Sequence, residues 1–132
     1  MRLLPCVLAL NLITLSCMNQ PTHYTYADGS GNRYILSPTS LEYDPITPEE
    51  SSTGMYSGGD PKTINISAEQ FSAAQTVLES AINNTAIHIP DRIKSSGAIS
   101  VSDRNEMKGY VIQPGCAEKI AIEKTLNEIL GQ

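Results

Sequence analysis

The sequence predicts an α+β fold with two layers, an antiparallel sheet of about five strands and two helices packed on one face of it. Short segments of alternating apolar and polar residues, separated by Gly, Pro, Asn and Asp, indicate strands joined by turns. Two later segments repeat their apolar residues at a helical period, and each has a single apolar stripe. One stripe per helix suits a sheet that is covered on one side only.

The first two predicted strands form a hairpin. Residues 23–27 alternate, the pentapeptide 28–32 is rich in turn formers, and residues 33–37 form the second strand before Pro38. The pentapeptide also has the alternating oxygen donors that open a calcium loop, but Thr39 stands where the bidentate acid belongs. A turn is therefore the preferred interpretation. A short third strand is expected at 41–43.

The segment 44–61 has neither a helical nor a strand period. It contains three prolines, three glycines and no basic residue. Loops of this length are usually either functional or disordered, so a solvated mobile loop and a binding loop both remain open. In the second interpretation, glycines widen the backbone choices and Met and Tyr supply contact area. The binding-loop candidates are Met55, Tyr56, Ser57, Gly58 and Gly59.

The best-specified element is a helix over residues 68–83, which follows a half-buried strand at 62–66. Ser67 is a natural N-cap residue, and Gln70 stands three positions later. Each side chain can therefore bond the backbone N–H of the other, which is a capping box.

The C-terminal third predicts a second hairpin and a second helix. Residues 86–94 suit an irregular or edge strand, and 98–102 and 109–113 form the hairpin across the polar residues between them. The last helix is expected over about 117–130, and Gly131 provides its C-terminal cap.

The N-terminus has the layout of a secretory signal peptide. One positive charge at Arg2 precedes a mostly apolar run over residues 3–15, and the small residue Ser16 follows it. Thirteen helical residues rise about 20 Å, which is too short for a hydrocarbon core of about 30 Å. The segment is therefore expected to be an export signal rather than a membrane span.

Cys17, directly after Ser16, resembles the processing site of bacterial lipoprotein precursors, in which that cysteine carries the lipid. The resemblance implies a signal peptide at 1–16 and a tether at 17–22. The remaining residues, 23–132, have the length and the predicted elements of a single α+β domain. It also implies a cell-envelope protein whose partner is the membrane, reached through the N-terminal lipid.

An ordinary signal peptide is the alternative, and it predicts a secreted or periplasmic protein. In that case Cys17 and Cys116 could form a disulfide in an oxidising compartment. If Cys17 is lipidated, Cys116 is the only thiol left in the mature chain.

The charge of the mature chain restricts its partners. Removing residues 1–16 leaves 8 Lys and Arg against 14 Asp and Glu, a formal net charge of −6. This balance disfavours nucleic acid and anionic lipid surfaces. A protein partner is compatible with it.

The motifs of common enzymes are missing from the sequence. It contains no nucleophile elbow, Walker loop, dinucleotide fingerprint or His-Glu-x-x-His zinc motif. The two histidines and the scattered carboxylates form no named constellation of nucleophile and base. No catalytic residue, cofactor or metal is therefore expected, although an uncharacterised hydrolase or metal-binding protein stays as an alternative.

Residues 57–130 carry a second resemblance. Ser57-Gly58-Gly59, followed by a strand, a helix, a hairpin and a final helix, is similar to emfourin-type bacterial inhibitors of thermolysin-like metalloproteases. That resemblance implies a protease inhibitor that presents the loop around these three residues. The broader expectation is an exported lipoprotein whose domain is a small non-catalytic binding or interaction module.

Overall fold

The computed structural model describes residues 22–132. The expected signal peptide, Cys17 and all but the last residue of the expected tether lie outside the described residues. The elements, in chain order, are β1 (His23–Ala27), β2 (Arg33–Leu36), β3 (Ser40–Asp44), β4 (Lys62–Asn65), α1 (Ala68–Asn83), the short 3-10 helix η1 (Thr85–Ile87), β5 (Gly97–Asp103), β6 (Glu106–Ile112) and α2 (Ala117–Leu130).

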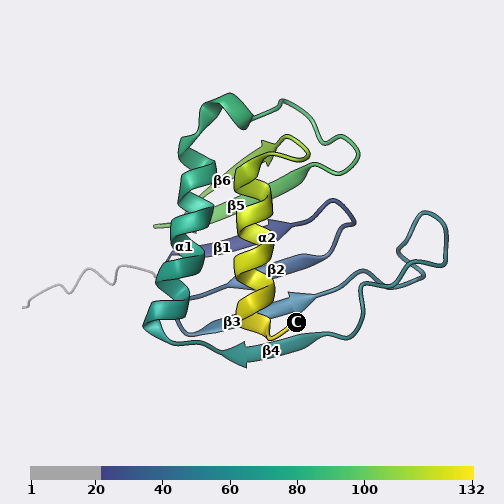
Figure 1. Ribbon diagram of the computed structural model, residues 1–132, viewed down its shortest axis with the longest axis horizontal. Helices are drawn as coiled ribbons and strands as arrows, with labels where there is room; N and C mark the ends of the chain where they lie inside the picture. The colour runs from purple at the N-terminus through teal and green to yellow at the C-terminus, as the bar shows by residue number, and fades with distance from the viewer. Residues whose placement is uncertain (1–21) are drawn as a thin grey trace, which may run out of the picture.

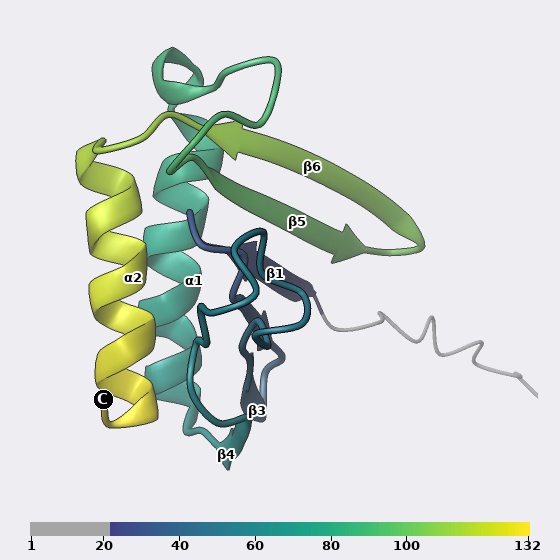
Figure 2. The same cartoon turned by 90° about the vertical axis from the view of Figure 1, so that its right-hand side faces the viewer.

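All the strands belong to one antiparallel sheet with the order β4-β3-β2-β1-β5-β6. Both helices lie on the same face of this sheet and run side by side (Figures 1 and 2). The predicted α+β class with two layers is confirmed. The sheet has six strands rather than about five, because the short segment expected at 41–43 is a full strand.

Strand alternation decides which side chains meet the helices. In β1, Tyr24 and Tyr26 are buried under them, whereas Thr25 points to the opposite side. We call that opposite side, which carries no helix, the open face. The open face therefore has the more polar side chains of the central strands, such as Ser100 opposite Thr25.

Helix α1 begins and ends where the sequence predicts. The Ser67 hydroxyl accepts from the backbone N–H of Gln70 at 3.2 Å, and the Gln70 side chain accepts from the backbone N–H of Ser67 at 2.9 Å. The predicted capping box is confirmed. Helix α2 also has the predicted bounds, and Gly131 closes it with a φ of 76°.

Residues 86–94, which the sequence predicts as an irregular or edge strand, form no named strand of the sheet. They begin with η1, and only an isolated bridge between His88 and Ile112 joins them to the sheet. The chain bends at Pro90 and Asp91, where the proline ring fixes φ near about −65°, and it leaves the edge of β6 there.

The second hairpin is longer than predicted. The sequence suggests a polar connection over 103–108, but the strands continue until only Arg104 and Asn105 separate them. Both residues have positive φ, 47° and 67°. That is the conformation of the two-residue turns whose twist matches antiparallel strands.

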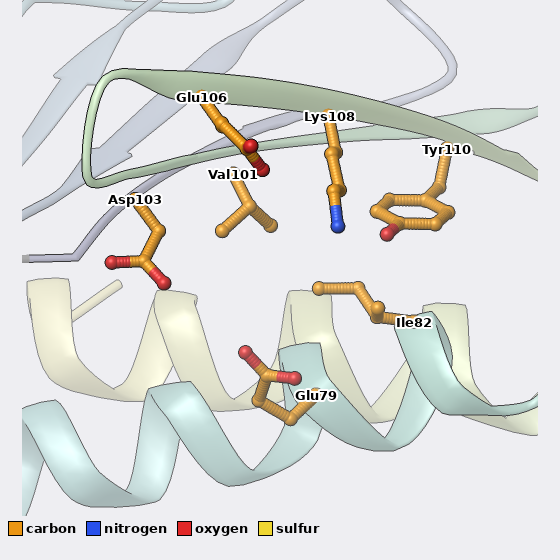
Figure 3. Close-up of a pocket in the computed structure, with 7 residues that line it drawn as sticks. All are labelled: Glu79, Ile82, Val101, Asp103, Glu106, Lys108 and Tyr110. Atoms are coloured by element: carbon orange, nitrogen blue, oxygen red, sulfur yellow. The ribbon is translucent and has the colours of Figure 1, made fainter.

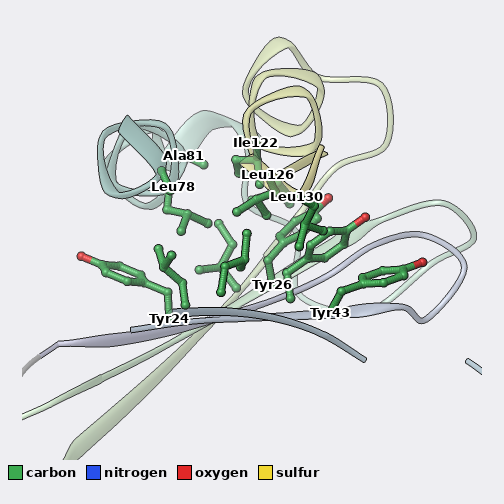
Figure 4. Close-up of a cluster of buried hydrophobic side chains, with 14 of the residues drawn as sticks. Tyr24, Tyr26, Tyr43, Leu78, Ala81, Ile122, Leu126 and Leu130 are labelled. Atoms are coloured by element: carbon green, nitrogen blue, oxygen red, sulfur yellow. The ribbon is translucent and has the colours of Figure 1, made fainter. Parts of the chain in front are cut away.

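Four tyrosines from the sheet lie in the core beneath the helices. Figure 4 shows the hydroxyls of Tyr24 and Tyr43 pointing away from the centre of this core. Each hydroxyl has a hydrogen-bond partner on another element. The pairs are Tyr24 with Glu79 at 2.5 Å, Tyr26 with Glu123 at 2.8 Å, Tyr34 with Asn127 at 3.1 Å and Tyr43 with the Gly58 carbonyl at 2.7 Å. The tyrosines therefore connect the sheet to α1, to α2 and to the loop before β4.

None of the helices in residues 22–132 has the length and apolar character needed to cross a bilayer.

Candidate functional site

The long segment between β3 and β4 is built from successive turns. Thr47 donates its N–H and its hydroxyl to the Glu50 carboxylate at 2.9 and 3.1 Å, which closes the first turn. Gly54 then donates to the Ser51 carbonyl at 3.1 Å and has a φ of 70°. Local hydrogen bonds therefore form the turns within this segment.

The two ends of this segment are joined to each other. The backbone N–H of Gly58 donates to the Ile46 carbonyl at 3.0 Å, and the Tyr43 hydroxyl donates to the Gly58 carbonyl at 2.7 Å. A surface loop with closed ends of this kind is an Ω-loop, and such loops are often functional. We call residues 46–58 the anchored loop.

One buried side chain holds the anchored loop against the rest of the domain. Asn32, in the turn between β1 and β2, is only 4% exposed. Its Oδ1 accepts from the Ile46 N–H at 3.0 Å, and its Nδ2 donates to the Tyr56 hydroxyl at 3.1 Å and to Asp28 Oδ2 at 2.9 Å. A single amide therefore connects the β1–β2 turn to both halves of the loop.

The candidate residues from the sequence divide into two groups. Met55 is 85% exposed and Tyr56 is 41% exposed, so both offer apolar surface to solvent. Ser57 is exposed, and its hydroxyl accepts from the Gly59 N–H at 3.2 Å.

Gly58 lies on the inner side of the loop. A Cβ at this position would stand 2.0 Å from Asn32 Oδ1 and 2.8 Å from Pro45 Cβ, so only glycine fits. Gly59 needs glycine for another reason, because its φ is 101° while no atom lies within 4 Å of an added Cβ. Gly58 therefore has a structural role, and the contact surface consists of its exposed neighbours.

Two hollows flank the anchored loop. The larger, of about 410 Å³, lies between the loop and the β1–β2 turn and is bordered by Ser30, Thr53 and Tyr56. The smaller, of about 260 Å³, is bordered by Arg33 and Asp44, which form an ion pair across β2 and β3. The surface around the loop is therefore both apolar at Met55 and Tyr56 and indented beside them.

The position of the anchored loop in the sheet follows from strand register. β1 begins at His23, which pairs with Ser102 near the β5–β6 turn. It ends at Ala27, which pairs with Arg33, and Arg33 pairs with Asp44 at the start of the loop segment. The chain thus enters the sheet at one end of β1, and the loop lies at the other (Figure 1).

A separate cleft lies between α1 and the β5–β6 hairpin (Figure 3). It has a volume of about 180 Å³. The side chains that line it are Glu79, Ile82, Val101, Asp103, Glu106, Lys108 and Tyr110.

Glu79, which lines the cleft, is hydrogen-bonded to the core residue Tyr24. Its hydroxyl donates to Glu79, and Gln75 Nε2 donates to the Tyr24 oxygen at 3.0 Å. Burial, together with the hydrogen bond to Glu79, raises the pKa of Tyr24 to about 12. Tyr24 is therefore a neutral donor at ordinary pH and a poor general base.

The remaining reactive side chains are engaged elsewhere. His88 Nε2 lies 2.9 Å from the Ala81 carbonyl oxygen, and its ring packs on Tyr110 with centroids 5.3 Å apart. Cys116 is partly buried at the start of α2 and forms no disulfide with a described residue. Over residues 22–132, no three His, Cys, Asp or Glu side chains come together in a way that could hold a metal ion.

The sequence did not single out Asn32 or Tyr43. Asn32 is an ordinary turn residue by composition, and its partners are 14 and 24 residues away. The one available signal was the pair of turn-rich segments, 28–32 and the loop, on either side of the short strands β2 and β3.

Comparison of the chain with protein-family models, with curated proteins and with solved structures finds no match, so its function has to be argued from its own residues.

Proposed function

We propose that this chain is an exported lipoprotein of the cell envelope whose domain is a non-catalytic binding module. The contact surface is the anchored loop, with Met55 and Tyr56 at its centre. The observation that supports this most is the buried Asn32 amide, which fixes a long exposed loop in one conformation.

A fixed loop favours binding for a thermodynamic reason. Ordering a flexible loop on binding costs conformational entropy for every residue that becomes fixed. The hydrogen bonds of Asn32 and Tyr43 order the loop when the domain folds. Binding of a partner therefore does not have to be accompanied by this loss of conformational entropy. Methionine adapts to irregular surfaces and tyrosine offers a broad face with few torsions, which suits the two exposed residues to a protein contact.

The proposed anchor agrees with this placement of the contact surface. If Cys17 carries lipid, five residues separate it from the start of β1 at His23. Fully extended, they span at most about 18 Å. The His23 end of the sheet would then lie near the bilayer and the anchored loop would point away from it, where a partner can reach it.

The lipid is tested by mass spectrometry of the processed N-terminus in the cells that produce the protein. A mature chain that begins at Cys17 with attached acyl chains is expected, and Cys17→Ser should abolish this species. An unmodified N-terminal residue on a water-soluble product contradicts the anchor.

The contact surface is tested with a photo-crosslinking amino acid placed at Met55 or, as a matched control, at Ile120. Ile120 is an exposed apolar residue on α2, outside the loop, with 60% of its surface exposed. One discrete adduct from position 55 that weakens in Tyr56→Ala is expected. Equal adducts from both positions, or none from position 55, would contradict the placement.

A further inference from the structure

Strand β6 is the last strand of the sheet, and only part of its outer edge is covered. On its inner side it pairs with β5 along its whole length, Glu106–Ile112. On its outer side, Ile89 donates to the Val111 carbonyl and Gln113 donates to the Ile87 carbonyl, both at 2.9 Å. The end of η1 and the two residues after it therefore cover this part of the edge through one isolated bridge.

The rest of that edge offers unpaired backbone groups. Successive residues of a strand present their N–H and C=O groups to opposite sides. Because Val111 faces outward, Gly109 and Met107 also face outward, and no backbone group in residues 22–132 hydrogen-bonds to that side of them. Met107 is 77% exposed, and open space surrounds Gly109.

A polar cleft lies directly beneath this free edge. Glu106, Lys108 and Tyr110 alternate with Met107 and Gly109, so their side chains point to the helix side and line the cleft against α1 (Figure 3). A strand added beside β6 would continue the sheet, and every second side chain of it would lie over the same cleft.

The charge of the cleft indicates what such a side chain should be. Its carboxylates are Glu79, Asp103 and Glu106, against one ammonium group at Lys108, a formal excess of two negative charges. The ion pairs among the described residues all lie elsewhere. A cationic side chain is therefore the complementary occupant.

Arginine fits the remaining lining better than lysine. Ile82 and Val101 give an apolar wall for its methylene groups, and the Tyr110 ring can stack against a planar guanidinium. Its fork of donors can also bind a carboxylate through two hydrogen bonds.

We propose that the free edge of β6 binds an extended segment of a partner protein by strand addition, with an arginine side chain of that segment in the α1–β6 cleft. This site lies at the end of β1 opposite the anchored loop, and it does not depend on the function proposed for that loop.

A second copy of this chain is a poorer occupant of the same edge. A symmetric antiparallel pair that uses Met107 and Gly109 places Lys108 opposite the Lys108 of the other copy, and like charges directly opposite are destabilising. A pair centred on Gly109 instead needs Val111, whose carbonyl already accepts from Ile89.

The proposal is tested with the peptide acetyl-Thr-Arg-Thr-Val-Thr-amide and its counterpart with Glu in place of Arg. Backbone amide shifts of the isotope-labelled full chain are followed during titration. The Arg peptide should shift the amides of Met107 and Gly109, and the Glu peptide should bind at least about tenfold more weakly. Absence of shifts at these two residues would overturn the proposal.

Methylated peptides test strand addition without altering the protein. The threonine side chains should lie on the open face, like that of Met107, so the threonine N–H groups should point toward β6. The valine N–H should point away from β6. N-methylation of the central and last threonines should abolish binding, and N-methylation of the valine should leave it. Equal binding by both methylated peptides would rule out strand addition.

Charge variants test the role of the cleft. Asp103→Asn with Glu106→Gln should weaken the Arg peptide about tenfold and leave the Glu peptide no weaker. Glu42→Gln makes a similar change on the open face of β3 and should have no effect. If sedimentation shows a dimer that Gly109→Pro abolishes, while the peptides cause no shifts, the edge belongs to a second copy and the proposal fails.

Discussion

The side-chain oxygen of Asn32 accepts a hydrogen bond from the backbone N–H of Ile46 at 3.0 Å. The same amide donates to the Tyr56 hydroxyl, so the beginning and the later part of the anchored loop share one buried anchor. This arrangement makes the loop part of the folded domain, and it can be tested without knowledge of the partner.

Replacing Asn32 by alanine should release the anchored loop. Ile46 would lose the acceptor of its N–H, and leaving such a group unsatisfied costs about 1–3 kcal/mol. We expect the free energy of unfolding in urea to fall by that amount and the amides of Ile46 and Gly58 to exchange faster with solvent. Asn65→Ala, which removes an exposed amide from β4, is the control and should change neither quantity.

Replacing Gly58 by alanine should also destabilise the loop, because the added Cβ meets Asn32 Oδ1. The penalty should shrink when Asn32→Ala is present, since the double variant lacks the first of the clashing atoms. A double-mutant cycle of unfolding free energies measures this coupling. Strict additivity of the two substitutions would mean that Gly58 and Asn32 do not compete for the same space.

Tyr24→Phe should make the free energy of unfolding less dependent on pH at high pH than it is in the wild type. The folded pKa of Tyr24 is raised to about 12, chiefly by burial, from an ordinary value of 10. Because the unfolded chain releases the Tyr24 proton at a lower pH than the folded chain, the raised pKa favours folding fully below pH 10. This contribution to the free energy of unfolding is lost as the pH rises from 10 towards 12. The wild type should release about one more proton on unfolding in this interval than Tyr24→Phe does.

Unfolding titrations at several pH values between 9 and 12, about the range set by these two pKa values, measure that difference. Phe71→Leu serves as the control, because Phe71 packs against Tyr24 with ring centroids 6.5 Å apart but carries no proton. It should lower stability equally at every pH. An identical pH dependence for Tyr24→Phe and the wild type would contradict the raised pKa.

Ser67→Ala should destabilise the domain by about 1 kcal/mol, because it removes half of the capping box that begins α1. Ser72→Ala tests the same chemical change inside the helix at an exposed position. There the substitution should be neutral or slightly stabilising, since alanine has the higher helix propensity. Equal losses of stability in the two variants, measured by urea unfolding, would argue against the cap.

Much of the fold could be predicted because its signals are local. The N-cap at Ser67, the helical stripe that follows it and the C-cap at Gly131 all lie within a few residues of the element that they specify. Strand alternation in β1 likewise identifies the buried face before any partner strand is known. The sequence did not predict the two-residue turn at Arg104–Asn105, because neither residue is a glycine, the residue that most often indicates a positive φ.

The sequence by itself determined the class of the fold, its helices, most of its strands and the long loop as the unusual segment. Whether that loop is mobile or fixed depended on Asn32 and Tyr43, whose partners lie 14 to 24 residues away along the chain. The free edge of β6 and the cleft beneath it likewise exist only after β5, β6 and α1 have packed together. Tertiary structure decided these features because contacts between residues distant in sequence leave no periodic or local pattern to read.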